Sequence, residues 1–146
     1  MLIHLISHVQ HINEEEVWQV RKLVEMLNYE SSNGAVVLVE GKRDNNALRA
    51  LGFSGRIVML NSHRGLSRVV DSLEHASKII LLLDMDSKGK YLTQRIIAML
   101  TNRKSVDLFY KKRLMEITRG RIRSIEELMS YRYSIAMSNP LADPLL

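Results

Sequence analysis

Two short, almost wholly apolar runs constrain the fold of this chain more than any other feature. Residues 35–39 read AVVLV and residues 78–83 read KIILLL. Short runs this rich in branched aliphatic residues are typical of strands buried on both faces, as in a parallel sheet. Each run ends at a carboxylate, Glu40 after the first and Asp84 after the second. The sequence therefore predicts two central strands whose carboxyl ends are acidic.

Helical patterns alternate with these runs and with two weaker strand candidates at residues 56–60 and 106–110. Apolar residues recur at helical spacing over residues 45–51, 66–73 and 92–100. Alternating strands and helices predict an α/β domain, with a mainly parallel four-stranded sheet, right-handed crossovers and flanking helices. Such sheets bind ligands at the edge formed by the carboxyl ends of the strands.

The rest of the chain predicts helical additions to a single domain. A chain of 146 residues, 46% of them hydrophobic, has enough material for one core. We assign residues 1–34 to an N-terminal helical segment that packs on the domain, and residues 35–110 to the core. Residues 111–146 form a basic helical segment with an extended tail, and residues 117–133 have helical spacing with Ser124 as a cap.

Several classes of protein are disfavoured by what the sequence lacks. It has no cysteine, which excludes a disulfide framework and fits a reducing cytoplasm. It shows neither a signal peptide nor an apolar run of about 18 residues, so we expect no membrane association. His4, His8 and His11 share one face of the first helical pattern. No acidic or cysteine ligand accompanies them, so we interpret that face as polar rather than as a metal site.

Three acidic residues stand where the ends of the two central strands would meet. Glu40 closes the first strand, and Asp84 and Asp86 follow the third. If the two strands are neighbours, their ends lie about 4.8 Å apart, and these carboxylates would approach and repel one another. Mg²⁺ favours sites in which a few carboxylates are completed by water and by phosphate oxygens. The sequence thus predicts a magnesium site at Glu40, Asp84 and Asp86.

Small and basic residues beside these acids predict contacts to phosphate. A glycine lets a phosphate approach the backbone, and a helix N-terminus offers N–H groups and a favourable dipole. An Asp before a helix taken alone fits an ordinary cap, and a lone Glu at a strand end fits a solvated side chain, but the two acidic segments together favour a site. The residues so assigned are Gly41, Lys42, Arg64, Lys88 and Gly89.

Basic charge is concentrated in one stretch of the chain. Residues 103–123 hold eight Lys or Arg and two acids, whereas the whole chain carries a net charge of +5. A basic stretch of this kind favours a polyanionic partner such as RNA or DNA. The predicted nucleic-acid contacts are Lys111, Lys112, Arg113, Arg119, Arg121 and Arg123.

At the acidic residues the sequence resembles the Toprim family, the catalytic domain shared by bacterial-type primases, type IA and type II topoisomerases and several nucleases. VVLVEGKRD resembles its glutamate motif and LLLDMDSKG its Asp-x-Asp motif. The resemblance covers residues 35–110, and the whole length resembles small stand-alone archaeal Toprim proteins. It implies that Glu40 acts as general acid or base, and that Asp84 and Asp86 coordinate magnesium.

Two functions from different classes follow from these expectations. The first is a magnesium-dependent, structure-selective nuclease or primase-like phosphotransferase. RNA is favoured because the motif block resembles that of a ribonuclease that matures ribosomal RNA in some bacteria. The second is a non-catalytic module that binds nucleic acid or nucleotide within a larger complex, with a protein partner or a second copy of the chain. A receiver or an aspartyl phosphatase is disfavoured because each places its paired acids after the first strand.

Overall fold

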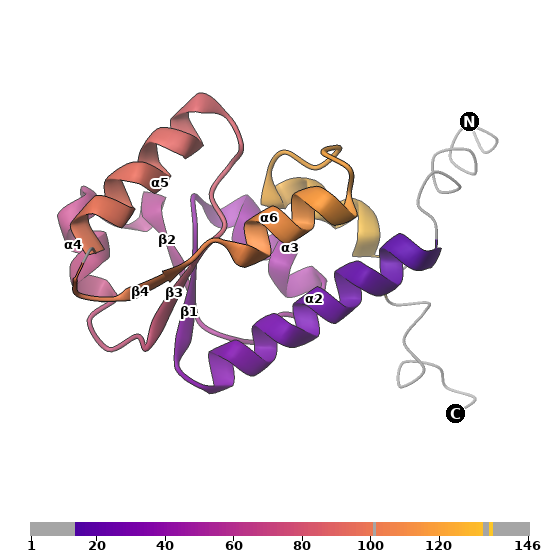
Figure 1. Ribbon diagram of the computed structural model, residues 1–146, viewed down its shortest axis with the longest axis horizontal. Coiled ribbons are helices and arrows are strands. Elements are labelled where there is room, and N and C mark those ends of the chain that lie inside the picture. Colours follow the sequence, from indigo (N-terminus) through magenta and orange to yellow (C-terminus); the bar gives the residue numbers. More distant parts are fainter. Residues whose placement is uncertain (1–13, 101, 133–134, 136–146) are drawn as a thin grey trace.

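The structure of the protein is a computed structural model that describes residues 14–100, 102–132 and 135. Strands and helices alternate along most of this part of the chain (Figure 1). The strands are β1 (Ala35–Val39), β2 (Ile57–Met59), β3 (Lys78–Leu81) and β4 (Ser105–Asp107). The helices are α2 (Glu14–Ser32), α3 (Lys42–Ala50), α4 (Leu66–Ser72), α5 (Ser87–Leu100) and α6 (Phe109–Ile117), with 3₁₀ helices η1 (Leu60–Ser62) and η2 (Ile125–Tyr131).

The four strands form one sheet in the order β2-β1-β3-β4, and all pairs are parallel. β1 and β3 are central neighbours, with Val36 opposite Ile79 and Leu38 opposite Leu81. The predicted α/β fold with a four-stranded parallel sheet is therefore confirmed. This order places the two strands that end in acids side by side.

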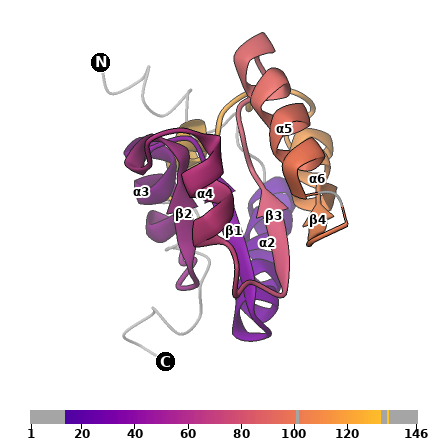
Figure 2. The ribbon, with the colours of Figure 1, turned by 90° about the vertical axis from the view of Figure 1, so that its left-hand side faces the viewer.

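Each face of the sheet is covered by its own set of helices (Figures 1 and 2). Alternate residues of β1 supply the two cores, because successive side chains of a strand point to opposite faces. Val37 and Val39 pack with α2, α3, α6 and η2. Val36 and Leu38 pack with α4 and α5 on the other face.

Some predicted boundaries were wrong. The last strand was expected over residues 106–110, but β4 ends at Asp107 and Phe109 begins α6. The Asp107 carboxylate accepts a hydrogen bond from the Phe109 N–H (2.7 Å), which turns the chain into the helix. The first helix of the core begins at Lys42 rather than at residue 45.

The helix expected over residues 117–133 is interrupted. α6 ends at Ile117, and Arg119 and Gly120 then adopt positive φ angles of 53° and 74°. The helical pattern resumes as the 3₁₀ helix η2, with Ser124 as its N-cap, as predicted. Left-handed backbone of this kind ends a helix, so the apolar residues on either side belong to separate elements.

Parts of the sequence-based interpretation fall outside the described residues. The three N-terminal histidines, His4, His8 and His11, lie there, as does the tail at residues 139–146. Among the residues that the structure does describe, no helix combines the length and the apolar character needed to cross a bilayer.

Candidate functional site

Glu40 and Asp84 lie at the carboxyl edge of the sheet, at the ends of its two central strands. The hydrogen bonding between those strands continues past β3, since the Leu82 N–H donates to the Leu38 carbonyl (2.9 Å). This pairing brings the two carboxylates together, and a protonated Asp84 can donate a hydrogen bond to Glu40. The expected meeting of these acids at one edge is thus present.

Burial makes both carboxyl groups hard to ionise, and neighbouring negative charges add to the effect. Burial raises the pKa of Asp84 to about 7, and the negative charges of Glu40, Asp44 and Asp86 act in the same direction. Burial also raises the pKa of Glu40, although the nearby Lys88 ammonium opposes the shift. Carboxyl groups with pKa values raised in this way are common at functional sites.

The donor atoms at this edge fit a hard cation. Oε1 of Glu40 and Oδ1 of Asp84 are buried, and when both groups are ionised neither atom accepts a hydrogen bond. A buried polar atom without a partner is costly, so such atoms call for an explanation. Carboxylate oxygens are the ligands that Mg²⁺ prefers in proteins. Glu40 and Asp84 thus have the chemistry of a magnesium site.

Asp86 is placed differently from the other two acids. Its side chain is exposed, and Oδ1 accepts a hydrogen bond from the Gly89 N–H (2.7 Å), which caps α5. Within the described parts of the chain, no three acidic or histidine side chains form a ready-made metal cluster. Asp86 would have to leave this capping position, or share it, in order to bind a metal together with Glu40 and Asp84.

Gly89 allows α5 to approach the Asp84 loop closely. A Cβ atom at this position would lie 2.0 Å from the Asp84 carbonyl oxygen, well inside the contact distance. Gly89 is buried and its N–H is bonded to Asp86. Gly89 therefore allows close packing beneath the site, and its contact with phosphate stays a prediction.

We expect Gly89→Ala to destabilise the fold by about 1–3 kcal/mol, because the added methyl group forces the α5 backbone away from Asp84. In an unconstrained helix the same change would stabilise the helix by about 1 kcal/mol. A loss of stability would therefore indicate that the added methyl group meets Asp84. Gly41→Ala is the matched control. Its Cβ would meet only the Asn61 side-chain amide, at 3.0 Å. Urea denaturation of both variants measures the difference, and equal stability of the two would contradict this view of Gly89.

Asp44 is a buried acid beside the site that the sequence analysis did not single out. Its side chain is 6% exposed and accepts hydrogen bonds from the Gly41 N–H (3.1 Å) and the Glu126 N–H (3.2 Å). Burial raises the pKa of Asp44, while these two N–H groups lower it. Asp44 therefore ties α3 to η2 directly behind Glu40. The available signal was its position in the Glu-Gly-Lys-x-Asp segment.

Lys111 lies beside the acidic site and is only partly exposed. Its Nζ lies 3.5 Å from the Asp84 carbonyl oxygen. Burial lowers the pKa of Lys111, and the carboxylates of Asp84 and Glu40 act in the opposite direction. The prediction that this lysine helps to bind nucleic acid is untested, but its place beside Asp84 was not foreseen.

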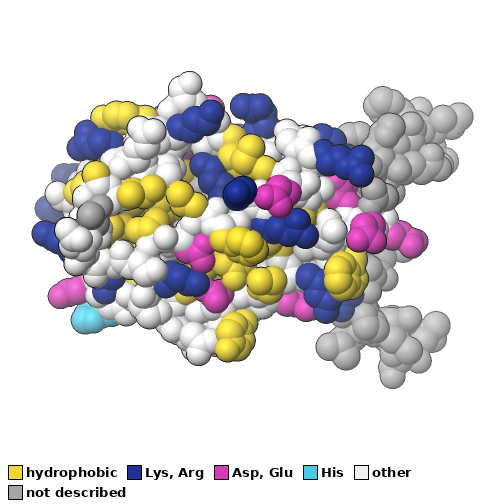
Figure 3. Space-filling model, in the orientation of Figure 1, with side chains coloured by type: hydrophobic (Ala, Val, Ile, Leu, Met, Phe, Trp, Pro, Cys, Tyr) yellow, Lys and Arg dark blue, Asp and Glu magenta, His cyan; other side chains and the backbone are white. Residues whose placement is uncertain are grey.

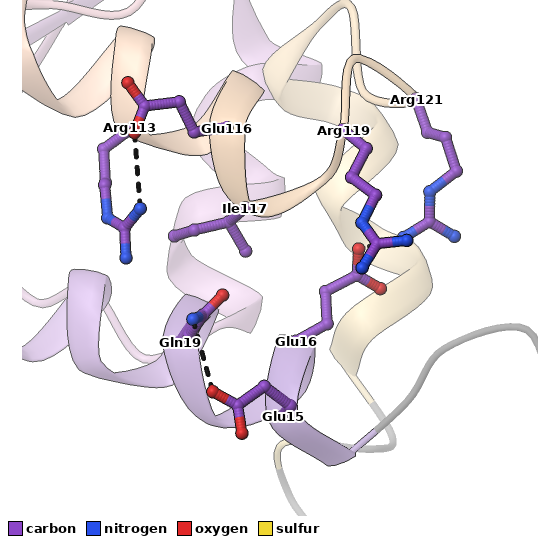
Figure 4. A pocket seen from close by; sticks show the side chains of 8 residues that line it. All are labelled: Glu15, Glu16, Gln19, Arg113, Glu116, Ile117, Arg119 and Arg121. Atoms are coloured by element: carbon purple, nitrogen blue, oxygen red, sulfur yellow. Dashed lines mark hydrogen bonds and ion pairs between the residues drawn. The ribbon is translucent and has the colours of Figure 1, made fainter.

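The other residues predicted to contact nucleic acid do not form one continuous basic surface. Arg113 pairs with Glu116 (3.4 Å), and Arg121 pairs with the buried Glu16. These residues and Arg119 line a cavity of about 470 Å³ between α2 and α6 (Figure 4). Three carboxylates share that cavity, so its character is mixed rather than cationic. Lys112 and Arg123 are exposed.

The residues predicted to bind phosphate are arranged around the acids at different depths. Lys42 is exposed in the first turn of α3, and Lys88 is exposed in the first turn of α5, close enough to Glu40 to affect its pKa. Arg64 is exposed in the loop after η1, and among the described residues it has no hydrogen bond or ion pair with the acids. Lys88 is therefore the best placed of the three.

A parallel four-stranded sheet with a glutamate after one central strand and Asp-x-Asp after its neighbour defines a metal-binding class of α/β domain that is related to nucleic-acid chemistry. The sequence model of one such family, the Toprim domain, matches residues 34–109. The chain therefore belongs to the Toprim domain family. Toprim domains generally bind Mg²⁺ and are associated with nucleic acids.

Archaeal proteins of similar length align with most of this chain. A UPF0292 protein of Archaeoglobus fulgidus is 34% identical over 77% of this chain and 89% of the relative. A UPF0292 protein of Thermococcus kodakarensis is 30% identical over 84% of this chain and 93% of the relative. A solved structure, a putative protein from Aquifex aeolicus, superimposes with a TM-score of 0.62 at 30% identity, and covers 73% of this chain and 94% of that one. These likenesses support the Toprim-like fold.

Proposed function

We propose that the protein is a magnesium-dependent nuclease that acts on structured nucleic acid, with RNA as the favoured substrate. The observation that carries this proposal is the pair of buried carboxylate oxygens, Glu40 Oε1 and Asp84 Oδ1, that lack partners at the carboxyl edge of the sheet. Glu40 and Asp84 would hold the metal, and Asp86 would join them or bind through water. A bound Mg²⁺ would neutralise charge on the phosphodiester and lower the pKa of a water molecule.

Each of the chain's own groups has a separate role in this proposal. Burial raises the pKa of Glu40, which makes it a better proton acceptor and suits it to take a proton from water and to return one to a leaving oxygen. Lys88 and Lys111 would orient the phosphate, since one is exposed at the start of α5 and the other lies beside Asp84. Phosphodiester cleavage is a reaction in which positioning and charge neutralisation supply most of the rate.

The direct experiment is to incubate the protein with a labelled RNA hairpin and with a DNA hairpin of the same sequence, each with and without Mg²⁺. Magnesium-dependent cleavage of the RNA supports the proposal. Binding without cleavage of either substrate would favour the alternative, a non-catalytic nucleic-acid module. The position of Asp86, bonded to Gly89 rather than to the other acids, is the observation that favours that alternative.

We expect binding to weaken as salt rises, because exposed cations around the site would displace counterions from the nucleic acid. If about three phosphates are contacted, log K should fall against log salt with a slope of roughly −2 to −3. Replacing Lys88 and Lys112 by Ala should make that slope less negative by roughly 1 to 2. The matched control replaces Lys22 and Arg103 by Ala. Lys22 lies on α2, and Arg103 lies just before β4, at the amino edge of the sheet. Equal effects of the two pairs would show that the acidic edge is not the binding surface.

A further inference from the structure

A groove beside the acidic site has an apolar floor and a cationic rim. It encloses about 410 Å³ between α5 and α6. Phe109 is 51% exposed there, and Leu108 and Met115 are each 40% exposed. The residues that line it are Thr93, Leu108, Phe109, Lys111, Lys112 and Met115, with no carboxylate among them. Figure 3 shows hydrophobic, basic and acidic side chains mixed on one face of the molecule.

The groove opens next to the candidate metal site. Lys111 lines it and lies 3.5 Å from the Asp84 carbonyl oxygen. Thr93 also lines the groove, from α5, and its hydroxyl donates a hydrogen bond to the Gly89 carbonyl (2.8 Å). Gly89 lies one helical turn earlier in α5 and packs against Asp84. A ligand bound at the acids could therefore extend past Lys111 into the groove.

The aromatic ring of the groove is held in place before any ligand binds. The Phe109 N–H is bonded to Asp107, and the Phe109 ring meets the Tyr110 ring edge to face, with 5.2 Å between centroids. Tyr110 is buried, so it anchors the first turn of α6 in the core. An exposed aromatic ring with a fixed position is a surface on which another flat ring can stack at little cost in entropy.

The chemistry of the lining selects the occupant. Apolar side chains favour a flat, poorly hydrated group, and Lys111 and Lys112 favour an anion attached to it. A second copy of this chain packed isologously on the groove would gather four lysines, with no carboxylate from the lining to offset them, which is unfavourable. A nucleobase with its neighbouring phosphates satisfies both requirements, as in proteins that stack single-stranded bases on aromatic residues within basic grooves.

We infer that this groove binds an unpaired nucleobase next to the phosphate held at the Glu40 and Asp84 edge. The inference deepens the proposed function and rests on it, because it defines the substrate as one with an unpaired nucleotide beside the reacting phosphodiester. The base stacks on Phe109 against Met115, and Lys112 contacts the adjoining phosphate.

The test is a double-mutant cycle between the protein and the nucleic acid, with affinity as the readout. The probes are an RNA hairpin with one bulged nucleotide, and the same hairpin with an abasic residue at the bulge. Loss of the base should weaken binding to the wild type by about 5- to 100-fold. Phe109→Ala should weaken binding of the intact hairpin by a similar factor. The variant should bind the intact hairpin and the abasic hairpin with equal affinity. Met115→Ala, on the other wall, should give a smaller effect in the same direction.

Two controls separate this inference from the proposed function. Tyr29→Ala removes another exposed aromatic residue, on α2, and should bind both hairpins as the wild type does. A wild type that binds neither hairpin would overturn the proposed function and this inference together. If binding depends on salt but its affinity is changed neither by Phe109→Ala nor by the abasic residue, the proposed base site is wrong and the proposed function still stands. Conversion of a dimer to a monomer by Phe109→Ala, with RNA binding unchanged, would assign the groove to self-association and would also overturn it.

Discussion

Replacing Glu40 by Gln is expected to slow magnesium-dependent cleavage by about 10²- to 10⁴-fold while leaving nucleic-acid affinity almost unchanged. The substitution keeps the size of the side chain and removes its ability to accept and release a proton. Burial and the neighbouring Asp86 and Asp44 charges raise the pKa of Glu40, so the variant also removes a charge that is costly in the folded state. Single-turnover cleavage rates and equilibrium binding, measured on the same RNA hairpin, separate the two effects.

Glu25→Gln is the matched control for this change. Glu25 is exposed on α2, where it pairs with Arg21 and Lys22 rather than with a residue of the acidic edge. Its replacement should leave both the rate and the affinity unaltered. A Glu40→Gln variant that cleaves at the wild-type rate would contradict the proton-transfer role. A loss of affinity as large as the loss of rate would assign Glu40 to binding alone.

Asp84→Asn should abolish stabilisation by magnesium and leave the metal-free fold as stable as the wild type or more so. Asn keeps the shape of the side chain but replaces a carboxylate oxygen by an amide N–H₂ that cannot bind a cation. It also removes the repulsion between Asp84 and the carboxylates of Glu40, Asp44 and Asp86. Damage to a core would instead lower stability, so the direction of the change distinguishes a functional acid from a structural one.

The pH dependence of the same variant follows from the raised pKa of Asp84. That pKa moves from 3.8 to about 7 in the folded protein, so the fold binds a proton more tightly than the unfolded chain does. Ionisation of Asp84 therefore destabilises the fold, and without metal this destabilisation is complete above about pH 7 and disappears as the pH falls toward 4. The advantage of Asp84→Asn over the wild type should be largest above pH 7 and should shrink on acidification. Metal-free melts at pH 5 and pH 8 measure it.

The positions of the acids at one edge were predictable because they depend on local sequence. Five consecutive apolar residues that end at Glu40 can hardly form anything but a buried strand, and the same holds for the run that ends near Asp84. Parallel strands place their carboxyl ends at a common edge, so the meeting of these residues followed once β1 and β3 were neighbours. Their adjacency itself was an assumption that the sequence could not supply.

The surroundings of the site depend on contacts between residues far apart in the sequence, and no local pattern encodes them. The Asp44 carboxylate is bonded to the Glu126 N–H, 82 residues along the chain, and Lys111 reaches Asp84 across 27 residues. A further long-range hydrogen bond runs from the Met85 N–H to the Arg123 carbonyl (2.9 Å). The C-terminal segment thus packs against the acidic edge, whereas its composition indicated only a basic helix.

Counting charges also could not reveal which cations are paired. Arg121 contributes to the basic stretch in the sequence, but in the fold it neutralises Glu16, whose side chain is only 5% exposed. Arg119 is exposed at a left-handed turn that ends the helix expected from the apolar spacing. Pairing of this kind is a property of the packed chain, so a net charge predicts a class of partner and not the surface that binds it.

The most direct measurement of the central claim, that Glu40 and Asp84 form a magnesium site, is the shift in melting temperature caused by Mg²⁺ at pH 8. A ligand at 100 times its Kd stabilises by about 2.7 kcal/mol, which corresponds to roughly 5–10 °C for a chain of this length. The account predicts such a shift for the wild type and for the control Glu25→Gln, and none for Asp84→Asn. A wild type unmoved by Mg²⁺, or an Asp84→Asn variant stabilised as much as the wild type, would contradict it.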